Sequence, residues 1–370
     1  MTCLDLSRAF DSLNHELLLK KLKKLQLTSS FYKLIETYLV DRLQFVHLNN
    51  FLSDQQIVES GTVQGGVISG TLFNFYTNSI KFLKLNSSCF LYCDDISLVT
   101  STKLAEDIKL ELEEDLETLS EWLQFHFLFP NPCKTKYILF HNKKRHEDFI
   151  LRALNIKFNN MQIERVESLR LLGLFIDETL NFSKHIAHIN SQLVPFMFAL
   201  KRIRHFISEK TAIVLYFAYI QSKLSFMNVI WQAAPKYLLE SLEILQRKSL
   251  RIVLRKDWFC HKNELYSSKI INVSNLCKLA SCVLVFKMVN ATAKNNNTFR
   301  TVNQLHGFNT RTNDCLVVAH CQLHLGMQNF YVHALNVFNS LPPHIRRLRS
   351  LGTFKDKCKV YFATDNSCNE

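Results

Sequence analysis

Glycine and proline are scarce in this chain of 370 residues, which has eight of the first and six of the second. Because both residues interrupt regular structure, their scarcity predicts that long helices dominate the fold. The chain also lacks a continuous apolar run of the ~20 residues needed to cross a membrane. Its nearest candidate, 212–231, is interrupted by several polar residues and a lysine. We therefore expect no membrane span.

A disulfide spacing pattern is missing as well. The eleven cysteines do not follow a disulfide framework, so we expect reduced thiols. The acidic Asp5 follows Met1 within four residues, so we expect no secretory leader. These absences predict a protein of the nucleus or cytoplasm, neither secreted nor bound to a membrane. One cluster, Cys315, His320, Cys321 and His324, could be drawn as a zinc site, but its spacing is irregular and no Cys-x-x-Cys pair occurs, so metal binding there stays open.

Charge is divided unevenly along the chain. Residues 1–140 have 13 Lys and Arg against 17 Asp and Glu, whereas residues 141–370 have 32 against 15. The whole net charge of +13 therefore comes from the second part. This division is typical of an acidic metal-binding region followed by a basic region that grips nucleic-acid phosphates. A blander interpretation, in which the excess lysine only maintains solubility, stays open.

The most informative segment is the tetrapeptide Tyr92-Cys93-Asp94-Asp95, which lies between two apolar stretches of strand-forming residues. This pattern predicts a β-hairpin with two carboxylates at its tight turn, where a divalent metal can reach them. A third carboxylate, Asp5, follows the apolar residues at the start of the chain. An isolated Asp pair is more often a solvated turn, so the assignment depends on further motifs.

Those motifs occur in a fixed order. Four of the eight glycines lie between Gly61 and Gly70, in a loop that leads into an apolar helix expected at 72–85. A flexible loop at a helix N-terminus can bring backbone N–H groups close to a phosphate or a base pair. After the acidic hairpin come 129–136, which leads into a strand at 137–140, and then 171–177.

Together these segments resemble the reverse transcriptase of non-LTR retrotransposons, most closely the jockey-type elements. In order, the five polymerase motifs correspond to 5–11, 61–74, 92–95, 130–140 and 171–177. The similarity extends further, to 219–224, Trp231, 245–248, 309–311, 339–343, Arg346 and 354–355. Five ordered motifs and a similar downstream part make the resemblance specific.

The resemblance implies an RNA-directed DNA polymerase, a nucleotidyltransferase that uses two Mg²⁺ ions. Its partners would be an RNA template, a DNA primer, the RNA–DNA duplex and deoxynucleoside triphosphates. Mg²⁺ prefers oxygen ligands, and two ions about 3.5 to 4 Å apart can stabilise both the attacking and the leaving oxygen. Asp5 and Asp94 would bridge both ions, and Asp95 would be an auxiliary ligand.

Other roles follow from the same resemblance. Phe10 would lie beneath the incoming sugar and exclude a 2′ hydroxyl, unless it is simply a core phenylalanine. Lys134 would protonate the leaving pyrophosphate or neutralise its charge, unless it is a surface lysine. The residues implied to bind nucleotide or template are Phe10, Gln64, Gly65 and Tyr92. Asp11 is expected to anchor the loop by hydrogen bonds rather than to bind metal.

The predicted fold class is α+β. Residues 1–180 would form a polymerase palm with partial fingers, in which a small antiparallel sheet carries helices on one face. A helical thumb-like region would follow at 181–258, and a helical C-terminal region at 259–370. Hydrophobic periodicity predicts a hairpin from 42–48 and 55–58, and helices at 14–27, 31–40, 102–127 (with a hydroxyl cap), 183–206, 209–232, 236–255, 272–289 and 328–341.

Some features depart from the family. Only four residues precede Asp5, so we expect most of the fingers to be absent and polymerase activity to be weak, as in an N-terminally truncated copy. Val63 and Gly70 replace prolines that relatives usually have in the second motif, and Cys93 replaces an alanine. The alternative function is therefore an inactive retroelement remnant that at most binds nucleic acid. The oligomeric state is not indicated.

Overall fold

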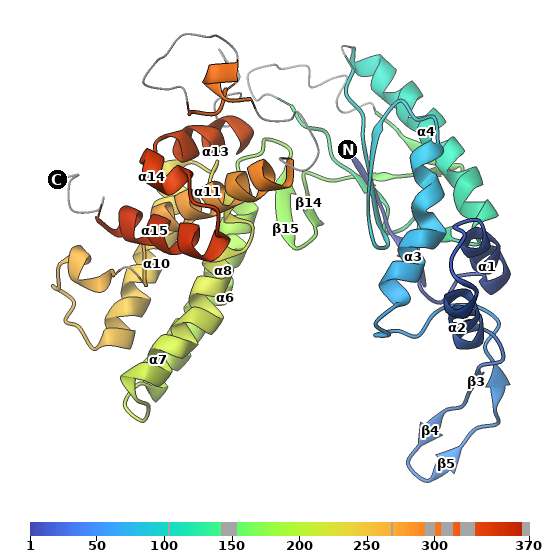
Figure 1. Ribbon diagram of the computed structural model, residues 1–370, viewed down its shortest axis with the longest axis horizontal. Helices are drawn as coiled ribbons and strands as arrows, with labels where there is room; N and C mark the ends of the chain where they lie inside the picture. Colours follow the sequence, from blue (N-terminus) through green and yellow to red (C-terminus); the bar gives the residue numbers. More distant parts are fainter. Residues whose placement is uncertain are drawn as a thin grey trace. The chain divides into compact units, whose positions relative to one another are not determined.

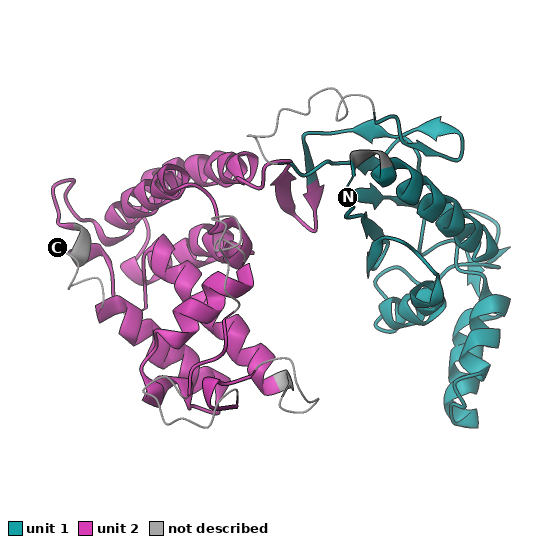
Figure 2. Cartoon of the chain, turned by 90° about the horizontal axis from the view of Figure 1, so that it is seen from above, with its two compact units in different colours: residues 1–169 teal, residues 170–370 magenta. Residues whose placement is uncertain are grey.

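The computed structural model describes residues 1–102, 104–141, 154–267, 269–292, 300–304, 314–318 and 330–364. It contains two compact units, residues 1–169 and residues 170–370 (Figure 2). Helix and sheet are mixed in the first unit, and the second is built mainly from helices (Figure 1). The division into three regions at 180 and 258 stays a prediction.

A five-stranded sheet organises unit 1. Its order is β13 (Glu164–Arg165), β10 (Lys136–Tyr137), β1 (Thr2–Leu4), β8 (Asp95–Val99) and β7 (Ser88–Tyr92). The pairs β10–β1, β1–β8 and β8–β7 are antiparallel, and β10 pairs with β13 in parallel. The hairpin predicted around the Asp-Asp motif is confirmed as β7 and β8. Two further small ladders join β2 (Leu6–Ser7) to β9 (Phe129–Pro130), and β11 (Lys157–Phe158) to β12 (Met161–Gln162).

Helices of unit 1 share one apolar core with this sheet (Figure 1). They are α1 (His15–Lys23), α2 (Ser29–Leu39), α3 (Ser69–Thr77) with a 3-10 turn (Asn78–Phe82), and α4 (Ala105–Phe125). Leu4, Ile96 and Leu98 from the sheet are buried with side chains from all four helices. Burial of this continuous apolar surface is the main free energy that holds the unit together.

The start of α4 corrects one prediction. No hydroxyl caps this helix, because the N-cap residue is Leu104, and the hydroxyl of Thr102 instead donates to the Leu104 carbonyl at 2.7 Å. Leu104 is also exposed and does not join the apolar core. By contrast, Asn14 caps α1 as a polar residue should, since its side-chain oxygen accepts from the Leu17 N–H at 2.8 Å.

The hairpin expected between 42 and 58 is present as two short ladders that extend from α2 (Figure 1). The first pairs β3 (Leu43–Gln44) with β6 (Gln56–Ile57), and the second pairs β4 (His47–Leu48) with β5 (Phe51–Leu52). All of these strand residues are exposed.

The fifth motif lies in a second hairpin, of β14 (Ser168–Leu171) and β15 (Leu174–Asp177). The helices that follow in unit 2 are α6 (Ser183–Ile203), α7 (Glu209–Tyr216), α8 (Ser222–Ser225), α9 (Asn228–Trp231), α10 (Lys236–Leu254), α11 (Val273–Thr292), α13 (Phe330–Asn339), α14 (Pro343–Arg346) and α15 (Leu351–Thr364). The helices predicted at 183–206, 236–255 and 272–289 are confirmed. The prediction at 328–341 is confirmed as α13, although 328 and 329 lie outside the described residues.

The single helix predicted at 209–232 is wrong. The segment is divided by a π-helical turn (Phe217–Gln221) and by Met227, whose φ is 48°. Trp231 explains the break, because its indole is fully buried and donates to the Phe226 carbonyl at 2.8 Å. A buried indole N–H needs an acceptor, and here a backbone carbonyl released from the helix supplies it.

Helix α11 corrects the expectation about apolar runs. Its segment Val273–Asn290 has a mean hydropathy of 1.3, which makes it long and apolar enough to cross a membrane by composition alone. Half of this segment is buried inside the molecule, where α11 packs with α13 and α15 in the core of unit 2 (Figure 1). A helix covered on several sides is apolar around most of its circumference, and this accounts for its composition.

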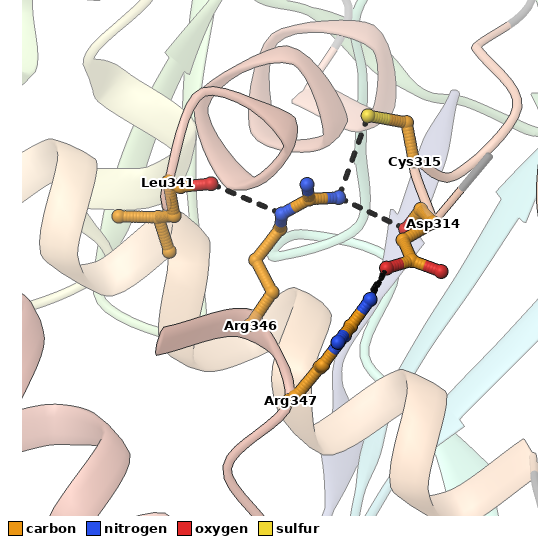
Figure 3. A network of polar contacts seen from close by, with 5 residues as sticks. All are labelled: Asp314, Cys315, Leu341, Arg346 and Arg347. Carbon is orange, nitrogen blue, oxygen red and sulfur yellow. Dashed lines mark hydrogen bonds and ion pairs between the residues drawn. The ribbon is translucent and has the colours of Figure 1, made fainter. Parts of the chain in front are cut away.

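The family-like residues 339–343 and Arg346, together with Arg347, have a structural role. Asn339 accepts from the Leu316 N–H and donates to the Leu316 carbonyl, both at 2.9 Å. The Arg346 guanidinium donates to the carbonyls of Leu341 and Asp314, and to the Cys315 sulfur at 3.4 Å (Figure 3). Arg347 forms an ion pair with Asp314 (Figure 3). These contacts fasten residues 314–318 to the end of α13.

The cysteines in the described part of the chain agree with the expectation of reduced thiols. The nine cysteines of the described ranges are free. Cys315 contacts Arg346, while His320, Cys321 and His324 lie outside the described residues, as do the family-like residues 309–311.

Candidate active site

Strand register brings the three aspartates of the sequence motif to one end of the sheet. Leu4 pairs with Ile96 across β1 and β8, so the next residue on each strand places Asp5 beside Asp95. Tyr92 pairs with Asp95 across β7 and β8, which leaves Cys93 and Asp94 as the two-residue turn. The predicted convergence of Asp5, Asp94 and Asp95 at this end therefore follows from two ladders.

The turn itself contains an unusual backbone conformation. Cys93 has a φ of 53°, in the left-handed region that costs an L residue roughly 1–2 kcal/mol. Such a conformation persists only when the surrounding structure holds it, and here the paired strands on either side of the turn do so. This conformation determines the position of the Asp94 carboxylate next to the end of the strand.

Like charges interact at this end of the sheet. Partial burial raises the pKa of the Asp95 carboxyl, and the neighbouring carboxylates of Asp94 and Asp5 raise that pKa further. A cation between these oxygens would remove the repulsion, so the donor set has the chemistry that Mg²⁺ requires. No preformed metal cluster of three Asp, Glu, His or Cys side chains occurs within the described ranges.

A lysine amine lies close to one of these carboxylates instead. The Lys134 amine is 3.4 Å from Oδ2 of Asp5, and both side chains are more than a third exposed. The backbone fixes this contact, because Asn131 donates its N–H to the Asp5 carbonyl at 2.8 Å and accepts from the Lys134 N–H at 3.2 Å. The fourth motif is thereby tied directly to the first.

A pocket of about 490 Å³ adjoins Asp94. Its lining residues come from the first and second motifs and from the turn, namely Leu6, Arg8, Ala9, Phe10, Asp11, Gln64, Gly65, Gly66, Ser69, Gly70 and Asp94. Phe10 is half-buried and stacks on the buried Phe73, with ring centroids 4.7 Å apart. Its ring is thus packed against the core while it also borders the pocket.

The glycine-rich loop is anchored by Asp11, as expected. The Gln64 amide donates to both carboxylate oxygens of Asp11, at 3.0 and 3.1 Å. Gly61 has a φ of 86°, and a Cβ there would lie 2.8 Å from the Asp11 Cα, so only glycine fits. Gly65 has a φ of 81° but open space around it, so only its backbone conformation favours glycine there.

Tyr92 and Arg8 also lie near these aspartates. Tyr92, which pairs with Asp95, has 64% of its side chain exposed. Arg8 lines the pocket and has a φ of 51°, yet sequence reasoning did not single it out. A usable signal existed, because Arg8 is the only Lys or Arg among residues 1–19 and stands between Asp5 and Asp11.

Comparisons with known proteins agree with these features. Residues 1–176 match the family model described as reverse transcriptase (RNA-dependent DNA polymerase). The chain is similar to a probable RNA-directed DNA polymerase from transposon BS of Drosophila melanogaster, with 24% identity over 68% of this chain and 28% of that protein. It is similar to the RNA-directed DNA polymerase from mobile element jockey of Drosophila funebris, with 24% identity over 71% of this chain and 29% of that protein.

Another relative is the probable polymerase from transposon X-element of Drosophila melanogaster, with 22% identity over 71% of this chain and 29% of that protein. Among solved structures, a telomerase from Candida albicans in complex with a fragment of telomeric RNA aligns with 80% of this chain and 51% of that chain. The sequence identity is 14% and the TM-score 0.34, too low to support a conclusion. The chain spans less than a third of the length of these curated relatives. Residues 1–176 thus match the reverse transcriptase family, and the chain is similar to the RNA-directed DNA polymerases of non-LTR retrotransposons.

Proposed function

We propose that this chain catalyses RNA-directed DNA synthesis at the end of the sheet where Asp5, Asp94 and Asp95 lie. The observation that carries the proposal is the register that sets these carboxylates together, beside a pocket lined by Phe10 and Gly65. Because the related proteins are RNA-directed DNA polymerases, a polymerase is favoured over an inactive remnant.

Asp5 and Asp94 would hold two Mg²⁺ ions, with Asp95 as an auxiliary ligand. When bound, Mg²⁺ would stabilise the charge that develops on the phosphoryl oxygens during nucleotidyl transfer. Partial burial and then the repulsion from Asp94 and Asp5 raise the Asp95 pKa, which supports this role because such carboxylates gain more from a cation than isolated ones would.

Lys134 would act on the leaving pyrophosphate. Its amine is exposed and lies beside Asp5, so it can carry a proton or a positive charge to a developing oxyanion. Phe10, braced by Phe73, would exclude a 2′ hydroxyl from the sugar. Gln64, Gly65 and Tyr92 would contact the template base pair.

We assign the sheet of unit 1 to a palm and α6, α7 and α10 to a thumb-like region. The excess of basic residues after 140 supports binding of the RNA–DNA duplex through its phosphates. Such binding should weaken steeply with salt and depend little on sequence.

Primer extension on an RNA template with deoxynucleotides and Mg²⁺ tests the proposal. Extension that requires Mg²⁺ and is lost in the Asp94→Asn variant would support it. Asp54→Asn is the matched control, because Asp54 is an exposed aspartate of unit 1 in the hairpin that contains β3 to β6. Extension that persists in Asp94→Asn would refute the assignment of the site, since one of the two aspartates proposed to hold both ions would be gone.

A further inference from the structure

Two large aromatic side chains occupy an exposed turn in unit 2. Helix α10 ends at Leu254, and the Cys260 N–H donates to the Asp257 carbonyl at 3.1 Å, which closes a turn with Trp258 and Phe259 at its centre. Such central positions usually have small or polar residues. Here the side chains of Trp258 and Phe259 are 61% and 95% exposed. Exposed apolar area of this kind points to a ligand.

Hydrogen bonds and an ion pair of neighbouring residues hold this turn in place. Arg255, at the end of α10, has a φ of 52° and reverses the chain. The Arg251 guanidinium donates to the Cys260 carbonyl at 3.3 Å. The Cys260 thiol donates to Glu264, whose carboxylate also pairs with Lys256, both at 3.3 Å. The aromatic rings are therefore presented by a fixed backbone rather than by a loose loop.

Cationic side chains lie close to the Trp258 ring. A pocket of about 540 Å³ at this turn is lined by Ile244, Arg247, Lys248, Arg251, Trp258, Phe259, Cys260 and His261, with no carboxylate among them. The Arg251 guanidinium and the Lys248 amine lie 5.2 and 5.9 Å from the centroid of the Trp258 ring. Nε of Arg251 is buried without a hydrogen-bond partner. The pocket thus combines exposed π-faces with the positively charged side chains of Arg247, Lys248 and Arg251.

We propose that this pocket binds an unpaired nucleic-acid strand, with bases stacked on Trp258 and Phe259 and phosphates held by Arg247 and Lys248. Aromatic platforms flanked by cations bind single strands in this way, because every base has a π-face and every nucleotide a charge. A duplex offers such faces only at its ends. The choice of nucleic acid among anionic ligands rests on the proposed function. The pocket itself is formed entirely by unit 2 and needs none of the aspartates.

Tryptophan fluorescence of the full chain gives a direct test. The chain has three tryptophans, and Trp122 and Trp231 are buried, so stacking at Trp258 would dominate any quenching by ligand. Labelled oligonucleotides of about ten nucleotides fit the usual site size, and separate RNA and DNA arms identify the preferred strand. We expect quenching, and an affinity about tenfold lower in Trp258→Ala. Trp258→Phe should lose the signal but keep most of the affinity measured by anisotropy of the label.

Matched variants separate stacking from charge. Tyr237→Ala removes another exposed aromatic residue of α10, outside the pocket, and should leave affinity unchanged. The double variant Arg247→Gln/Lys248→Gln should weaken binding and flatten its dependence on the logarithm of salt concentration by about 1.4. The double variant Lys355→Gln/Lys357→Gln makes the same charge change on α15 and should not flatten it.

Several outcomes would overturn the inference. They are an absence of quenching, equal binding of an abasic oligonucleotide, and equal affinities of Trp258→Ala and Tyr237→Ala. A blue shift on anionic vesicles without any response to oligonucleotides would assign the turn to a membrane surface instead. Quenching should persist in Asp94→Asn, so a failure of polymerase activity alone leaves this site intact, and a failure of quenching alone leaves the polymerase proposal intact.

Discussion

The amine of Lys134 lies 3.4 Å from the carboxylate of Asp5, so the fourth motif places a positive charge beside an aspartate of the first motif. This pair adds little to stability, because both side chains are well exposed to solvent. Instead, the Lys134 amine would compete with a divalent cation for the space beside Asp5.

Replacing Lys134 with Met should separate metal affinity from rate. Divalent affinity should stay the same or increase, because a competing cation is gone, whereas the extension rate should fall by about 10²-fold through loss of a general acid. Lys136→Met is the control, since Lys136 pairs with Glu164 at 3.0 Å in the next strand. Single-turnover kinetics with a Mg²⁺ titration measure both quantities. A rate equal to that of the control would contradict the assigned role.

Asp95→Asn should stabilise the protein at neutral pH. The folded-state pKa of Asp95 is raised above its ordinary value of 3.8, so ionisation of this carboxyl is harder in the folded state and destabilises it as pH rises through that range. The variant should therefore melt at a higher temperature at pH 7, and the difference should vanish well below pH 3.8, where both side chains are neutral. Thermal unfolding without divalent ions at several pH values tests this. A difference that does not depend on pH would exclude charge repulsion as its cause.

His126 should make unit 1 sensitive to acid. Burial lowers its pKa from 6.5 to about 4, and its Nε2 accepts from the Lys21 amine at 2.6 Å while its ring stacks on Trp122. Between pH 4 and 6.5 the His126 ring binds a proton in the unfolded chain but not in the folded chain. The free energy of unfolding should therefore fall as pH drops from 6.5 towards 4. Hydrogen exchange in α1 and α4 should show this loss, and His126→Gln should reduce its slope. The exposed His47→Gln should keep the wild-type slope, and an equal change in both variants would argue against His126 as the cause.

Phe10→Val should relax selection against ribonucleotides. The ring borders the pocket next to Asp94 and is braced by Phe73, so a smaller side chain would leave room for a 2′ hydroxyl. Ribonucleotide incorporation should rise by about tenfold or more relative to deoxynucleotide incorporation. Phe10→Tyr keeps the ring and should keep the selectivity. Unchanged selectivity in Phe10→Val would make Phe10 a core residue only.

Asn339→Ala should destabilise unit 2. The side chain makes two hydrogen bonds to the backbone of Leu316, a buried residue, and their loss should cost about 1–3 kcal/mol. Asn336→Ala, an exposed position on the same helix, is the matched control. Denaturant unfolding measures both, and equal free energies of unfolding would show that the clamp of residues 314–318 does not contribute.

Local patterns predicted much of this structure. The acidic hairpin at Tyr92 to Asp95 and the helices α1, α6 and α10 follow from periodicity and turn composition within a few residues of sequence. The acidic turn is the feature that the sequence indicated most directly. Its partner Asp5 was matched through family resemblance, because antiparallel pairing between residues some 90 positions apart leaves no local trace.

Tertiary contacts account for what the sequence could not reveal. The break before Trp231 depends on a carbonyl that a buried indole requires, and the contact between Lys134 and Asp5 depends on the backbone bond from Asn131 to Asp5. The apolar character of most of the α11 surface was not predicted, because the helices that cover it, α13 and α15, lie far along the chain. The aromatic turn at Trp258 became visible only when its exposure and the cations of α10 were seen together.

Direct measurement of divalent binding tests the central claim, that Asp5, Asp94 and Asp95 form one metal site. Mn²⁺ can stand in for Mg²⁺, and its electron paramagnetic resonance signal distinguishes free from bound ion. We predict that the wild-type chain binds Mn²⁺, and that Asp5→Asn and Asp94→Asn each greatly weaken this binding while Asp54→Asn does not. Mn²⁺ binding that is equal in all four proteins would contradict the account.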